Sequence, residues 1–265
     1  MTGMTTRAVA AAAILCTASS LGAQGISYGP GSAKYRVSTI AVQSQEMQGQ
    51  SRTDSATTIQ YISVSVTQKS KDTLQFAMSF DSGSVKSTSP MAAADVNKLK
   101  GLRVTGTMSP IGKRYASMAT DTVTEGAADL ALGLTRLFVP IPGGAKTGTA
   151  WTDTTSTKAN RSGIDISSQS ITNYKVAGDT MYAGQKAWRI QRVSAVTASG
   201  SGTTQNQVVT IQSSGTVNGT LYLSAGGMYL ASNSLQSQTG KVTLPVMGME
   251  IPQTVHITTM VELLK

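Results

Sequence analysis

The residues best suited to chemistry are few in this 265-residue chain, and they stand apart from one another. Its one histidine is His256, and its one cysteine, Cys16, lies close to the N-terminus. A metal ligand or a catalytic base normally comes with partner residues. The sequence therefore disfavours a zinc site and a Ser-His-Asp triad, and we expect His256 to face solvent or to be structural.

Other catalytic motifs are absent or incomplete. No Gly-x-Ser-x-Gly turn occurs, and the glycines of residues 143–148 lack the spacing of a phosphate loop and lead into no helix. Asp153 and Asp165 would serve a hydrolase only if they converged across a cleft, which stays an open alternative. We therefore expect a protein that is not an enzyme, with no catalytic residues, no metal and no cofactor.

The stretch from Thr122 to Trp151 is the element around which the chain is organised. Thr122 and Glu125 have capping-box spacing, and prolines follow at Pro140 and Pro142, which cannot continue a helix. The sequence predicts an amphipathic helix over residues 122–138 that packs on the apolar face of a sheet. Its apolar stripe is formed by Ala127, Leu130, Leu134, Leu137 and Phe138.

Most of the remaining chain has the period-two alternation of β-strands. The alternation is regular from Leu74 to Phe80, and it slips between Tyr61 and Ile62, as a β-bulge would cause. A second, short helix is predicted from Met91 to Leu99. About ten to twelve strands without a fixed repeat predict a mainly β fold, a large curved antiparallel sheet with both helices packed on it.

The N-terminus has the pattern of a signal peptide: Arg7, an apolar run to Cys16 that is too short to span a bilayer, and small residues up to Ala23. We predict cleavage after Ala23, a flexible lead-in over residues 24–32 and a single β-rich domain over residues 33–265. A lipoprotein signal is the alternative, but Leu15 stands directly before Cys16, where a small residue is expected. The expected location is the periplasm or the exterior.

The charges indicate no nucleic-acid partner. Lys and Arg number 22 against 13 Asp and Glu, but they are scattered, and aromatic residues make up only 5% of the chain. Nucleic-acid-binding proteins cluster their cations and interleave aromatic side chains. An outer-membrane barrel is a rival for a secreted β-rich chain, but aromatic girdles are missing and polar runs occupy both strand faces. No transmembrane span is predicted.

The order of motifs resembles a family of secreted bacterial proteins of unknown function. It comprises the N-terminal meander, the central helix, a proline corner at residues 140–142, Trp151, and Trp188 within residues 184–190. This family is in turn similar to the lipoprotein-carrier (LolA/LppX-like) half-barrel, a curved antiparallel sheet with helices in its concave face. The resemblance implies an apolar concavity suited to an acyl chain or an apolar peptide, and it implies no catalytic residues.

We therefore expect a non-enzymatic extracytoplasmic protein that binds a lipid or another apolar or amphipathic envelope component between the sheet and the central helix. Two proline-interrupted apolar segments, residues 137–142 and 242–252, are further candidates for contact with a ligand. The alternative is a structural or protein-interaction module of the envelope with a solid core and no ligand. The candidate ligand-binding residues are Phe76, Met78, Phe80, Leu130, Leu134, Phe138, Met247 and Met249.

Overall fold

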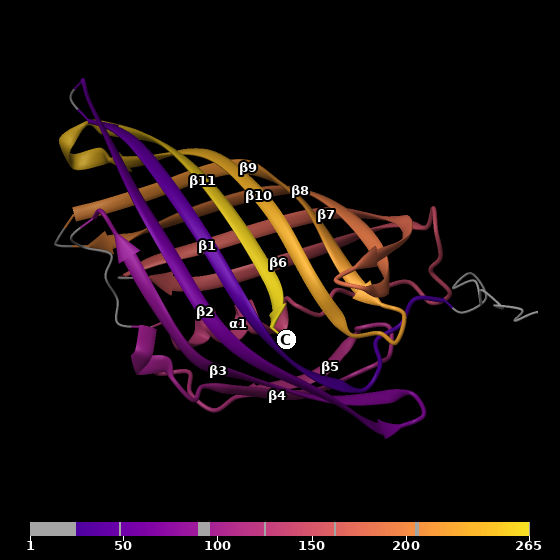
Figure 1. The fold of residues 1–265 in the computed structure, drawn as a ribbon. Helices are drawn as coiled ribbons and strands as arrows, with labels where there is room; N and C mark the ends of the chain where they lie inside the picture. Colours follow the sequence, from indigo (N-terminus) through magenta and orange to yellow (C-terminus); the bar gives the residue numbers. More distant parts are fainter. Residues whose placement is uncertain are drawn as a thin grey trace, which may run out of the picture.

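One large antiparallel sheet dominates the computed structural model, which describes residues 25–47, 49–89, 96–124, 126–161, 163–204 and 207–264. In these residues the sheet has 11 strands in the order β5-β4-β3-β2-β1-β11-β10-β9-β8-β7-β6. Each strand pairs with the next one in the sequence, except that β5 does not pair with β6, and the pairing of β1 with β11 joins the two halves. The sheet is not closed, since β5 and β6 remain its two edges (Figure 1).

Several strands are long, and β2 alone has 21 residues, which corresponds to roughly 70 Å at about 3.3 Å per residue. Such strands extend well beyond the part of the sheet that is covered by the one α-helix of the described residues (Figure 1). The bounds are β1 Gly31–Met47, β2 Gln50–Ser70, β3 Thr73–Ser87, β4 Arg103–Met108, β5 Arg114–Ala119, β6 Ala150–Arg161, β7 Ile164–Tyr182, β8 Gln185–Thr204, β9 Gln207–Ser224, β10 Tyr229–Leu244 and β11 Met249–Leu264.

The predicted β class and the predicted details of the N-terminal meander are confirmed. Leu74, Phe76, Met78 and Phe80 are each at most 1% exposed, so the regular alternation of β3 does mark a fully buried face. The register between β2 and β3 shifts at Tyr61 and Ile62, as the slip in the apolar pattern predicted.

The central helix is shorter than predicted. It is α1, Ala127–Thr135, and Gly126 precedes it with a left-handed φ of 83° and no side-chain cap. Thr122 lies before the helix, so the predicted N-terminus is wrong, and Glu125 lies outside the described residues. The physical reason is Gly126, whose left-handed φ cannot belong to a right-handed helix. Before it, the Asp121 carboxylate accepts hydrogen bonds from the backbone N–H groups two and three residues ahead, at 2.8 and 3.0 Å.

The second predicted helix is described only at its end, where Val96–Leu99 form the short 3₁₀ helix η2, since residues 90–95 lie outside the described part. The apolar segment 242–252 is mostly strand, interrupted only by η3, Pro245–Met247, and Gly248. Pro252 sits inside β11 opposite Lys241. Because the pairing of β11 with β1 ends one residue away, at Gln253, the missing N–H of Pro252 breaks no bond on that side.

The hydrophobic core lies at one end of the concave face. It is covered by α1 and by the chain that follows it, which we call the closing segment, residues 136–149 (Figure 1). Tyr35 marks the centre, since its hydroxyl reaches beneath β11 to donate to the Tyr229 carbonyl at 2.6 Å. No helix in the described ranges is both long and apolar enough to cross a membrane.

The closing segment is hydrogen-bonded to both halves of the sheet. Ile141 N–H donates to the Ile111 carbonyl next to β5, and Gly148 N–H donates to the Val176 carbonyl on β7. The N-terminal residues run alongside it, because Ile26 N–H donates to the Ala145 carbonyl. These bonds hold the closing segment across the gap that the open sheet leaves.

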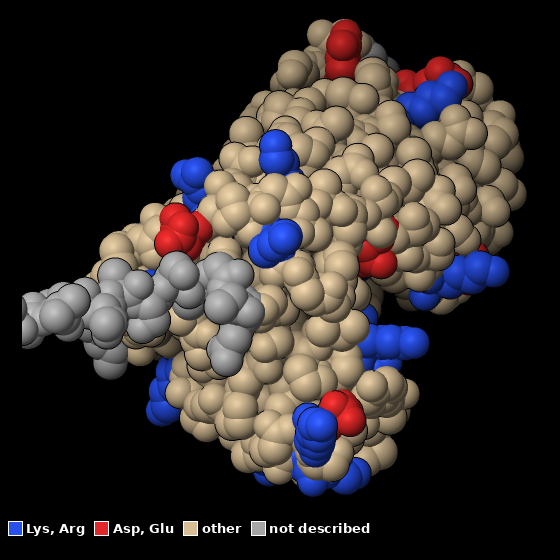
Figure 2. All heavy atoms as spheres, turned by 90° about the vertical axis from the view of Figure 1, so that its right-hand side faces the viewer, with Lys and Arg blue, Asp and Glu red and all other residues tan. Residues whose placement is uncertain are grey.

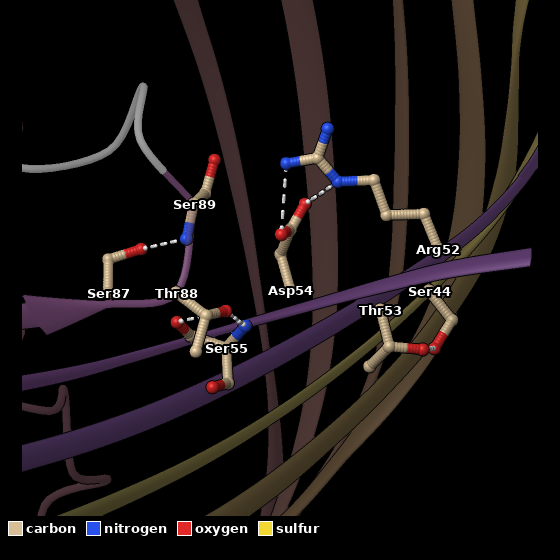
Figure 3. Close-up of polar contacts among 8 residues, drawn as sticks. All are labelled: Ser44, Arg52, Thr53, Asp54, Ser55, Ser87, Thr88 and Ser89. Atoms are coloured by element: carbon tan, nitrogen blue, oxygen red, sulfur yellow. Dashed lines mark hydrogen bonds and ion pairs between the residues drawn. The ribbon is translucent and has the colours of Figure 1, made fainter.

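The far end of the sheet is polar on both faces. Figure 3 shows Arg52 and Asp54 on one side of β2, with Arg52 Nε 3.0 Å from the Asp54 carboxylate. Thr53 lies on the other side, 3.0 Å from the Ser44 hydroxyl of β1. This end is therefore held by backbone ladders and surface polar contacts, with no share in the main hydrophobic cluster.

Candidate functional site

A cavity of about 860 Å³ lies between the concave face of the sheet and the chain from α1 to Pro140. Its size falls within the roughly 300–1,000 Å³ that is typical of ligand pockets. It begins where the solid core ends, with Ile62 and Val261 at the core side and Thr39 and Gln236 farther along the strands.

One wall of this cavity is apolar. The half-buried Leu130 and Leu137 and the buried Leu134 and Phe138 come from α1 and the start of the closing segment. The ring of Phe138 is held in place by an edge-on contact with the ring of Tyr28, at a centroid distance of 5.3 Å. These side chains present a continuous aliphatic and aromatic surface to the cavity.

The opposite wall, from β6 to β8, is covered with hydroxyl groups. Thr157 and Ser168 oxygens lie 2.6 Å apart, and those of Thr172 and Ser194 lie 2.9 Å apart in a buried pair. These hydroxyls satisfy one another across the strands, and each keeps capacity for a further hydrogen bond. We call these four residues the hydroxyl wall.

Three arginines also line the cavity: Arg114 at the start of β5, Arg136 at the end of α1, and Arg192 in β8. Burial, together with the positive charges of Arg114 and Arg192, lowers the pKa of Arg136, whereas Asp129 acts in the opposite direction. Asp153 is the one carboxylate among the described lining residues. The cavity is therefore electropositive as well as amphipathic.

A stacked aromatic pair borders the arginines. Trp151 and Tyr174 are nearly parallel, with ring centroids 5.0 Å apart. Burial raises the pKa of Tyr174, and the Arg192 charge opposes this shift, so the phenol remains neutral at ordinary pH. Of the two, Tyr174 lines the cavity, and Trp151 stacks against it from outside the lining.

The predicted ligand-binding residues fall into three groups. Leu130, Leu134 and Phe138 line the cavity. Phe76, Met78 and Phe80 lie fully buried in the core, and the Phe76 ring is 5.3 Å from that of Phe138. Met247, which is 53% exposed, ends η3, Met249 begins β11, and neither lines the cavity. Whether any of them binds a ligand remains a prediction.

The candidates for catalysis do not converge. Asp153 lies on the concave face of β6, whereas Asp165 is exposed, paired to Ser201 on the outer face, and accepts a hydrogen bond from Asn160. His256 is exposed on the outer face opposite Val42. No group of three or more His, Cys, Asp or Glu within the described ranges could hold a metal ion.

A second depression, of about 520 Å³, lies on the outer face over β1 to β4. Small residues such as Ser63, Ser65 and Ala77 form its floor, with Lys34 and Arg103 at its margin. Outer-face charges elsewhere are dispersed, and Figure 2 shows Lys and Arg separated by uncharged residues on the face it presents. The concave cavity, with its converging charged and apolar groups, is the better candidate site.

No protein-family model matches the chain, and no curated protein matches its sequence. Among solved structures, it is similar to a mutant of the Rh. blastica porin, with 9% identity, 88% of this chain and 100% of that chain covered, and a TM-score of 0.25. It is also similar to a DUF1329 family protein from Desulfovibrio piger, with 10% identity, 87% and 86% covered, and a TM-score of 0.16. At these scores neither likeness carries an argument about function.

Proposed function

We propose that the protein binds an amphipathic ligand, such as a single-chain lipid, in the cavity beneath α1, and that it does so outside the cytoplasm. The observation that carries the proposal is the pairing of an apolar wall with a hydroxyl wall around one space of about 860 Å³. An aliphatic chain along the apolar wall would release water at about 25 cal/mol per Å² of apolar surface buried. The resemblance of the sequence to lipoprotein-carrier half-barrels favours the same class of ligand, and the signal-peptide pattern favours export.

The test begins with protein purified from its own cell envelope. Native mass spectrometry should detect a reproducible added mass, and organic extraction should recover it as an amphiphile. A bare polypeptide mass with no extractable compound would refute the proposal and favour the alternative, a structural or protein-interaction module.

A matched pair of variants links the bound mass to the cavity. Gly133 lines the cavity, and a Cβ placed there meets no atom within 4 Å, so Gly133→Trp adds a bulky indole at the cavity from an unobstructed position. Gly143 is equally open but does not line the cavity, which makes Gly143→Trp the control. The added mass should disappear in the first variant and persist in the second. Retention of the ligand in both would place its binding elsewhere.

A further inference from the structure

The three arginines of the cavity come from distant parts of the sequence. Arg114 begins an edge strand, Arg136 directly follows α1, and Arg192 lies in the middle of β8. The positive charges of Arg114 and Arg192 both act on Arg136. Like charges that lie close together repel each other, and this costs free energy unless an opposite charge is present.

Carboxylates offset the cavity arginines only in part. Elsewhere, Arg36 lies 3.9 Å from Glu262, and Lys241 lies 2.8 Å from Glu250. In the cavity, Asp129 acts on the charge of Arg136, whereas among the described residues no ion pair joins Asp153, the carboxylate of the lining, to any of the three arginines. An excess of positive charge therefore faces the cavity.

The side chain of Arg192 lies where the neighbouring strand has a glycine and therefore no side chain. It pairs with Gly219 of β9, and a Cβ on that glycine would lie 3.0 Å from Arg192 Nε. Arg192 Nε is buried and has no hydrogen-bond partner among the described residues. A buried donor without a partner is costly, and such a group usually indicates that something else completes it.

We propose that Arg114, Arg136 and Arg192 bind the anionic head group, a carboxylate or a phosphate, of the amphiphile whose tail lies along the apolar wall. This inference rests on the proposed function and specifies the ligand class. Guanidinium groups match both head groups with paired hydrogen bonds. The buried Thr172 and Ser194 hydroxyls belong to the same lining. The one that accepts in their mutual hydrogen bond keeps its own O–H as a further donor.

The test uses three ligands that share one alkyl chain: lauric acid, dodecyl phosphate and the uncharged dodecanol. Titration calorimetry on the delipidated full-length mature protein gives each dissociation constant at low and at high salt. We expect the two anions to bind at least tenfold more tightly than dodecanol, because charge-assisted hydrogen bonds are strong ones. Their ranking shows whether the head group is a carboxylate or a phosphate.

The variants are Arg192→Gln and Arg136→Gln, with Arg189→Gln as the control. Arg189 lies three residues before Arg192 in the same strand but is exposed on the outer face, opposite Tyr222. Each cavity variant should weaken the anions about tenfold, leave dodecanol within about twofold and reduce the salt dependence. The control should change none of these. Arg136 lies at the exposed end of α1, so its variant keeps the test valid if Arg192→Gln does not fold.

Two outcomes separate the inference from the proposed function. If dodecanol and the anions bind equally and neither arginine variant changes their affinity, the anion site is refuted, whereas the amphiphile cavity is supported. If no ligand binds, and none is extracted from the native protein, both ideas are wrong.

Discussion

The substitution Tyr28→Phe removes a single oxygen atom, yet we expect it to lower the free energy of unfolding of this protein substantially. The Tyr28 hydroxyl donates to the Val139 carbonyl oxygen at 3.2 Å and accepts from the Val139 N–H at 2.8 Å. Both residues are almost fully buried. The phenylalanine ring would keep the edge-on contact with Phe138, but it would leave a backbone donor and a backbone acceptor without their partner.

The size of the effect follows from these two groups. A buried polar group that loses its partner costs about 1–3 kcal/mol, and the two groups belong to one residue, so we expect a total of roughly 2–4 kcal/mol. In a domain of this size each 1 kcal/mol lowers the melting temperature by about 2–4 °C. The variant should therefore melt roughly 4–16 °C below the parent protein.

Urea unfolding monitored by tryptophan fluorescence gives the free energy of unfolding, and calorimetry gives the melting temperature. Tyr115→Phe is the matched control, because Tyr115 is 57% exposed and the same atom is removed. The control should lie within about 0.5 kcal/mol of the parent protein. A Tyr28→Phe variant as stable as the control would refute the reasoning, since it would mean that the closing segment is not held by this hydroxyl.

Further predictions concern two glycines and a buried phenol. Gly133→Ala in α1 should stabilise the protein by about 0.5–1 kcal/mol, since alanine favours the helix and its Cβ meets no atom within 4 Å. Gly106→Ala in β4 should destabilise the protein by about 1–3 kcal/mol, because the new Cβ would clash with the Ala116 carbonyl and lie 2.5 Å from the Phe76 ring. Urea unfolding measures the change in each glycine variant, and a change of the opposite sign would contradict the prediction for that variant. Burial raises the pKa of Tyr229 to about 12, so above pH 10 the folded protein keeps a proton that the unfolded chain releases. This phenol should lower the free energy of unfolding from pH 10 to 12 by up to about 1.4 kcal/mol per pH unit. Burial also raises the pKa of Tyr28 and of Tyr35, and these phenols add to the fall, so Tyr229→Phe should make it shallower without abolishing it. An identical fall in the variant would argue against this phenol.

The strands were predictable because their signal is local. Alternation from Leu74 to Phe80 identifies a buried face within a few residues, and the β-bulge at Tyr61 and Ile62 appears as a slip in the same pattern. Within each half of the sheet, β1 to β5 and β6 to β11, each strand pairs with the next along the chain. Such meanders require no long-range information beyond the join of β1 to β11.

The start of α1 was not predictable in the same way. Thr122 and Glu125 have the spacing of a capping box, but the Asp121 carboxylate accepts from the N–H groups two and three residues ahead of it, and Gly126 adopts a left-handed φ of 83°. A left-handed residue interrupts a right-handed helix, so the helix begins after it, five residues after Thr122.

The lining of the cavity could be predicted only in part from the sequence. Its apolar wall was partly found, through Leu130 and Phe138, because a helical stripe shows in the sequence. The hydroxyl wall was missed, since β6 and β7 are polar on both faces and alternation cannot tell which side is inner. Arg192 was missed for a related reason. In the sequence it stands between Gln191 and Val193, and nothing there indicates a functional role. Its position becomes apparent only when β9 places Gly219 opposite it.

The position of the cavity follows from the distribution of apolar and polar side chains along the concave face of the sheet. Core residues gather at one end, so the closing segment is anchored there by Tyr28 and by the bonds of Ile141 and Gly148. Beyond that end the concave side chains become Thr, Ser and Gln, which cannot drive the closing segment to pack onto them. The space therefore opens where apolar burial stops and polar lining begins. A site at such a boundary has one apolar and one polar side. Arg192, which lies next to Gly219, adds a positive charge to the lining of this site.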